Sequence, residues 1–125
     1  MKIHALVGAA CLAAGSAAFA AGGHDTKPQY GGIVQDVRDV SYELVARPDV
    51  ITIYVDDHGK KVSTVGATAK ATPLNGAEKT EVALTPGAEN RLEAKGSFKI
   101  QKGTRVIALV ILAGKPPATT RYEIK

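Results

Sequence analysis

Histidine and carboxylate side chains occur together at two places in the chain, and these are the residues whose types could do chemistry. His24 is followed directly by Asp25, and Asp56 and Asp57 directly precede His58. Imidazole nitrogen and carboxylate oxygen are ligands that suit Cu(II), Ni(II) and Zn(II). The two groups therefore predict divalent metal binding as the chemistry to test first.

The position of His24 favours one kind of metal site. Cleavage after Ala20 would leave Ala21-Gly22-Gly23-His24 as a new N-terminus. A free amine, glycine amides and an early imidazole can wrap a square-planar Cu(II) or Ni(II) ion. Histidine in third place gives the tightest form, so cleavage after Ala21 would make a stronger site. The alternative is a polar leader that binds no metal.

The second group has the composition of a tight turn, Asp56-Asp57-His58-Gly59, because Gly59 can take a positive φ. Consecutive side chains of such a turn point in different directions, so it would supply two ligands at most. We expect both of its carboxylates to lie in water and to stay ionised, like the pair Asp36 and Asp39, which does not make a matched acid and base. The alternative for His58 is an exposed turn residue.

No residue pattern predicts catalysis. A hydrolytic triad needs a histidine beside a nucleophile and an orienting carboxylate. Ser63 is close to His58 in sequence but lacks the glycine-bracketed elbow that exposes a catalytic serine. The glycine pairs Gly22-Gly23 and Gly31-Gly32 have neither the Lys-Ser/Thr partner nor the helix of a phosphate loop. The sequence therefore predicts a protein that is not an enzyme.

Residues 1–20 have the pattern of a secretory signal peptide. Lys2 supplies the positive charge, the run from Ala5 to Ala14 is apolar, and Ala18-Phe19-Ala20 is an A-x-A cleavage site. The apolar run is too short to span a membrane. We expect cleavage after Ala20, a periplasmic location and no membrane span in the mature chain.

The only cysteine and the only methionine, Cys11 and Met1, lie within this segment. Cys11 could be a lipobox cysteine, but the aliphatic residue normally found three positions earlier is missing. We therefore interpret Cys11 as a small hydrophobic residue of the signal helix. The mature chain would then lack the soft ligands for Cu(I) and a Cys₂His₂ zinc site. Loss of Lys2 leaves 15 of the 16 basic residues against 12 acidic ones, a net charge of +3. These basic residues are scattered, which argues against nucleic-acid binding.

The rest of the chain predicts a flexible leader, residues 21–29, followed by one β-domain, residues 30–125. Val40–Ala46 alternates between two faces, Val50–Val55 reads as a central strand, and Lys61–Val65 as a short edge strand. Thr104–Leu112 contains the most apolar run, VIALVIL, whose β-branched content favours a strand.

The spacing of the turns predicts seven or eight antiparallel strands without helices. We expect an all-β fold, a two-sheet antiparallel sandwich of immunoglobulin-like or fibronectin-like type, with a small closed barrel as the alternative. The core should consist of Val, Ile and Leu, with Tyr42, Tyr54 and Tyr122 as larger inward side chains.

Several segments resemble a family of small exported proteobacterial proteins with the pattern HGG…YELV…LYV-x-DHG. They are His24 with Tyr30–Val34, Tyr42–Val45, Ile53–Lys60 and Asn90–Phe98. The resemblance implies association with heavy-metal efflux systems, copper above all. This chain departs from the pattern in having Asp25 after His24, and Tyr30 rather than His before the glycine pair.

Together these observations predict a periplasmic, non-enzymatic binding or accessory protein. One version binds a divalent metal, Cu(II), Ni(II) or Zn(II), through His24 and Asp25 or through Asp56, Asp57 and His58. The other is an interaction module that binds no metal. In that version an edge strand, near Lys61–Val65 or at the C-terminus, pairs with a strand of an envelope or efflux protein.

Overall fold

The structure is a computed structural model, and it describes residues 27–125, which form ten strands and no helix. No helix long and apolar enough to cross a bilayer occurs in this part of the chain. The strands are β1 (Ile33–Val37), β2 (Val40–Ala46), β3 (Val50–Asp57), β4 (Lys60–Lys61), β5 (Thr68–Asn75), β6 (Glu78–Lys79), β7 (Val82–Pro86), β8 (Arg91–Lys95), β9 (Arg105–Ile111) and β10 (Ala118–Glu123).

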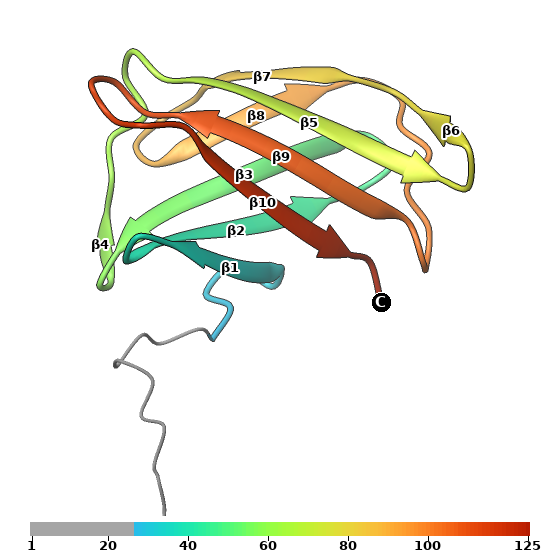
Figure 1. Ribbon diagram of the computed structural model, residues 1–125, viewed down its shortest axis with the longest axis horizontal. Coiled ribbons are helices and arrows are strands. Elements are labelled where there is room, and N and C mark those ends of the chain that lie inside the picture. The colour runs from blue at the N-terminus through green and yellow to red at the C-terminus, as the bar shows by residue number, and fades with distance from the viewer. Residues whose placement is uncertain (1–26) are drawn as a thin grey trace, which may run out of the picture.

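All strand pairs are antiparallel, and one continuous path of hydrogen bonds joins most of them in the order β1-β2-β3-β8-β7-β5-β9-β10. The two-residue strands β4 and β6 pair with β3 and β5 at the side of this path. Figure 1 shows the path curling round so that its two ends, β1 and β10, come near each other. The described fold is therefore an all-β antiparallel sheet that is nearly closed.

Strand β7 carries the sheet round one corner. Its first residues, Val82–Leu84, pair with β5, whereas Thr85 and Pro86 pair with β8. One strand thus hydrogen-bonds to both halves of the sheet, β1-β2-β3-β8 and β5-β9-β10. The opposite corner, between β1 and β10, has no such ladder.

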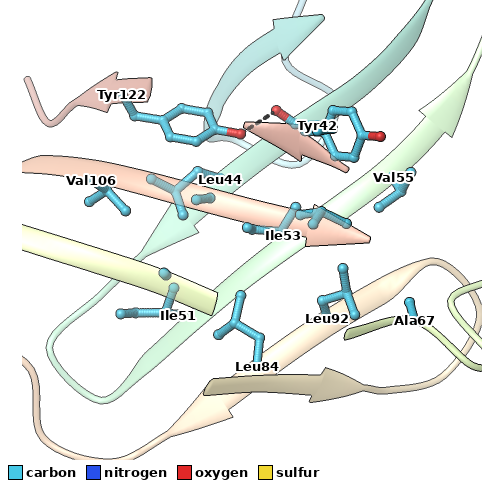
Figure 2. Packing of buried hydrophobic residues seen from close by; sticks show 14 of the residues in the cluster. Tyr42, Leu44, Ile51, Ile53, Val55, Ala67, Leu84, Leu92, Val106 and Tyr122 are labelled. Carbon is cyan, nitrogen blue, oxygen red and sulfur yellow. Dashed lines mark hydrogen bonds between the residues drawn. The ribbon is translucent and has the colours of Figure 1, made fainter. Parts of the chain in front are cut away.

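Aliphatic side chains fill the space between the two halves of the sheet (Figure 2). In β3, Ile51, Ile53 and Val55 are fully buried on the inner face, as the period of two along a strand requires. Tyr42 and Tyr122 are also buried, as expected. Tyr54 is not an inward side chain, because it alternates with Ile53 and Val55 and so lies on the outer face.

Strand β9 is apolar on both faces. Val106, Ala108 and Val110 are buried inside, and the alternate positions Ile107 and Ile111 face outward. This explains the apolarity of the VIALVIL run without a helix. The strand prediction for this run is confirmed.

The expected and observed strands agree closely in the middle of the chain. The prediction for Val40–Ala46 is confirmed to the residue, and β3 lies between β2 and β8 as a central strand should. Ten strands replace the expected seven or eight, partly because β4 and β6 contain only two residues each. The predicted edge strand Lys61–Val65 is reduced to Lys60–Lys61.

Candidate functional site

The turn between β3 and β4 carries the one predicted pair of metal ligands that the structure brings together. His58 (φ 51°) and Gly59 (φ 83°) are its two central residues, and both have the positive φ that a two-residue hairpin requires. His58 Nδ1 lies 2.6 Å from Asp57 Oδ1, and both side chains are more than half exposed. This contact places a carboxylate on one ring nitrogen of the histidine.

Asp56 lies apart from this pair. It is the seventh residue of β3, and only 5 % of it is exposed. Its Oδ1 is 3.3 Å from the Asn90 amide nitrogen and 3.5 Å from the Tyr30 hydroxyl, and both of these groups donate to it. The expectation that Asp56 and Asp57 lie together in a watery loop is therefore wrong for Asp56, because β3 extends two residues beyond Val55.

Burial raises the pKa of Asp56 above its ordinary value. The Tyr30 hydrogen bond lowers this pKa, the charge of Glu43 raises it, and Lys61 lowers it. The carboxyl thus has the environment of an inner structural group, although it lies on the outer face of the sheet. Asp36 is also in a strand, β1, where it accepts a hydrogen bond from Ser41 at 2.6 Å, so the loop expectation for Asp36 is wrong too.

The ligand set at the turn is small. No group of three His, Cys, Asp or Glu that could hold a metal occurs within residues 27–125. The hollow beside Asp57 and His58 is also lined by Lys60 and Lys61, whose charges oppose a cation. His24 and Asp25, the other predicted ligands, lie outside the described residues, as do the predicted signal peptide and its predicted cleavage site.

Glu43 holds the segment that leads into β1. Its carboxylate is buried, and it accepts hydrogen bonds from the backbone N–H groups of Gln29, Tyr30 and Gly32 at 2.7–2.8 Å. A side chain at position 32 would overlap the carbonyl of Leu44, so only glycine allows this close approach. The outward position of Glu43 in β2 was predictable, but its three partners were not.

This anchoring lays Tyr30 flat on Tyr54. The two rings stack with centroids 3.8 Å apart and planes 6° from parallel. The Asn90 amide reaches the Tyr30 hydroxyl at 3.2 Å and the carbonyl of Val55 at 3.1 Å. Tyr30, Tyr54, Asp56 and Asn90 therefore form a satisfied polar cluster that covers the outer face of β3.

The corner between β1 and β10 is open, because no backbone ladder joins these two strands. At one end it is fastened by Arg38, whose guanidinium donates to the carbonyls of Pro116 and Pro117 at 3.2 and 2.8 Å. Inside, the Tyr122 hydroxyl donates to the Tyr42 carbonyl at 2.9 Å (Figure 2). No backbone ladder joins β1 to β10 within residues 27–125, so side-chain bonds such as these help to fasten the corner.

At the other end of this corner lies a groove of about 420 Å³, which we call the β1–β10 groove. Ile33 and Tyr122 line its inner side, and Gln35 is exposed there although its neighbours on that face of β1 are half-buried. Arg105, Arg121, Glu123 and Lys125 form its remaining lining. Three cations and one carboxylate thus surround an unpaired edge.

Comparisons with known proteins do not assign this chain to a family. No protein-family model matches the chain, and no curated protein matches it. A solved structure described as "Crystal structure of Br derivative BhCBM56" has some similarity to it. The similarity has a TM-score of 0.44 and 12 % sequence identity, and it covers 72 % of this chain and 97 % of that one.

Proposed function

We propose that this chain is a non-enzymatic interaction module of the cell envelope, which binds an extended segment of a partner along the open corner between β1 and β10. The observation that carries the proposal is that the strands at both ends of the hydrogen-bonded path have one unpaired edge each, beside the β1–β10 groove. An unpaired strand presents a row of N–H and C=O groups with which another strand can pair. Of the two edges expected from the sequence, the C-terminal one supports this role.

Several finer statements belong to the same proposal. The protein is exported, with cleavage after Ala20, to the periplasm, where its partner is an envelope or efflux protein. The family resemblance to exported proteins linked with metal efflux supports this location. The fold is a sandwich of two packed sheets that share β7. The division of β7 between β5 and β8 supports this statement. A hydrogen-bonded ladder between β1 and β10 in solution would make it a closed barrel instead.

Photo-crosslinking tests the proposal. A photoreactive residue replaces Gln35 in β1 or Arg121 in β10, both exposed at the groove, and Lys95 in β8 is the control, because it is exposed elsewhere. We expect adducts from Gln35 and Arg121 with one partner segment, identified by mass spectrometry, and none from Lys95. Adducts of equal yield from Lys95, or none from either edge, would rule the proposal out.

A second candidate is divalent metal binding, favoured by the 2.6 Å contact between Asp57 and His58. A carboxylate on Nδ1 is the arrangement in which histidine coordinates a metal through Nε2. Calorimetric titration of the processed protein with Cu(II), Ni(II) and Zn(II) tests it, with His24→Ala and His58→Ala as variants. Loss of heat in one variant assigns the site, and the absence of heat in the unaltered protein removes this candidate.

A further inference from the structure

The direction of the main-chain groups in β10 shows what the β1–β10 groove offers a partner. The N–H of Ile124 donates to the Thr104 carbonyl, and the Ile124 carbonyl accepts from the Gly103 N–H. Main-chain groups of successive residues in a strand point to opposite sides. Those of Arg121 and Glu123 therefore point away from β9, toward the groove.

Strand β1 presents its main chain in the same way. The N–H and C=O of Val55 are bonded on the side of β3 away from β2. Val55 is the register partner of Tyr42 in β2, so the main-chain groups of Tyr42 also point away from the β2–β3 ladder. They bond toward β1, where the register partner of Tyr42 is Gln35. The groups of Val34 and Asp36, on either side of Gln35, then face β10. Donors and acceptors thus line both sides of the groove.

The side chains of the groove divide between two faces. Ile33 and Tyr122 belong to the inner face, because their register partners Leu44 and Val106 are buried in the core. Arg121 and Glu123 alternate with Tyr122 and therefore belong to the outer face, where Arg105 is the register partner of Glu123. Apart from Gln35, the inner face is apolar, and the outer face is charged.

The outer charges are unbalanced. Within residues 27–125, no ion pair with a carboxylate is formed by Arg105, Arg121 or Lys125. Glu123 faces Arg105 in the register without an ion pair between them. Other lysines of the surface do have carboxylate partners, as in the ion pairs Lys61–Glu89 and Lys99–Glu78.

We infer that the β1–β10 groove takes an extended acidic peptide in which aliphatic and acidic residues alternate. This inference rests on the proposed function and adds the chemistry of the partner. The peptide's main chain pairs with the free edge of β10 or β1. Its aliphatic side chains face Ile33 and Tyr122, and its carboxylates face Arg105, Arg121 and Lys125. The period of two along a strand separates the two sets.

Peptide titration of the full mature chain tests the inference. The probes are a peptide of alternating Glu and Val, one of alternating Lys and Val, and a Glu/Val peptide of the same composition in two blocks. Fluorescence anisotropy measures affinity, and ¹⁵N chemical shifts locate binding. We expect the alternating acidic peptide to bind most tightly, to shift the amides of Arg121 and Glu123 or of Val34 and Asp36, and to lose affinity in high salt.

Charge reversal supplies the matched control. Arg105→Glu with Arg121→Glu should weaken the alternating acidic peptide about tenfold or more, because two surface attractions become repulsions. Lys79→Glu with Lys95→Glu makes the same change of net charge away from the groove and should leave affinity within about twofold. Circular dichroism checks that both double variants stay folded.

The outcomes separate this inference from the proposed function. Tighter binding of the alternating basic peptide, at the same edge amides, would overturn the acidic preference and leave strand pairing intact. Equal binding of the block peptide would overturn the alternation. If neither alternating peptide shifts an edge amide, strand pairing itself fails, and the inference fails with it.

Discussion

The two corners of the sheet are closed by different means. At β7, backbone ladders run to β5 on one side and to β8 on the other. At β1 and β10 no ladder joins the strands, and the fastening includes hydrogen bonds from the side chains of Arg38 and Tyr122. A ladder loses several bonds together, whereas a side-chain bond can break alone. The first corner is therefore suited to holding the fold together, and the second to admitting a partner.

The largest effect is expected from a cavity made at the β7 corner, which backbone ladders close. Leu84 is buried in β7 beside the switch from β5 to β8, so Leu84→Ala should lower the free energy of unfolding by about 3 kcal/mol. Urea denaturation measures it. A loss below about 1 kcal/mol would show that the β7 corner contributes little to stability.

A smaller loss is expected at the open corner. Tyr122→Phe keeps the buried ring but removes the hydroxyl that donates to Tyr42, which should cost about 1 kcal/mol. Hydrogen exchange should quicken in β1 and β10 but not in β7. Equal quickening in all three strands would mean that the two corners open as one.

A gain in stability, rather than a loss, is expected when Thr120 is replaced by valine. Its Oγ1 is buried and forms no hydrogen bond of ordinary geometry within residues 27–125, although it acts on the nearby Tyr122 hydroxyl. Thr120→Val keeps the shape and removes this unsatisfied group, so the midpoint of thermal unfolding should rise, in line with a gain of about 1 kcal/mol. A lower midpoint would show that this hydroxyl has a partner in solution.

The smallest effect concerns pH and Asp56. Because burial raises the pKa of Asp56, the folded chain binds this proton more tightly than the unfolded chain does. Its contribution to stability therefore decreases as the pH rises from the ordinary value of 3.8 through the raised pKa, and levels off above it. Asp56→Asn should remove this decrease. Parallel urea midpoints for the two proteins across this pH range would contradict the assignment.

The sequence was informative where the deciding forces are local. The alternation in Val40–Ala46 and the β-branched run from Val50 depend on neighbouring residues, and both strands form as expected. The polar cluster is different, because Tyr30 and Asn90 reach Asp56 from segments 26 and 34 residues away. No local pattern reports such a meeting, and for this reason Asp56 was expected in a loop.

The groove shows the same limit. The sequence suggested an edge strand near the C-terminus, but not that β1 would face it or that Arg105 would join Arg121 and Lys125. Those positions follow from the curl of the whole sheet. Of the predicted ligands, Asp57 and His58 were local neighbours and do meet, while the predictions for His24 and Asp25 remain untested.

The two-sided apolarity of β9 has a consequence for the chain before it folds. Until β5 and β10 take their places beside it, Arg105–Ile111 is an exposed β-former that could associate with its counterpart in another molecule. In the finished sheet Lys70 and Arg121 flank its outward side chains as register neighbours of Leu109 and Ile107, and their charges discourage association of folded molecules through this outer face. Arg121, for which we propose a partner at the groove, thus also protects the folded molecule against aggregation.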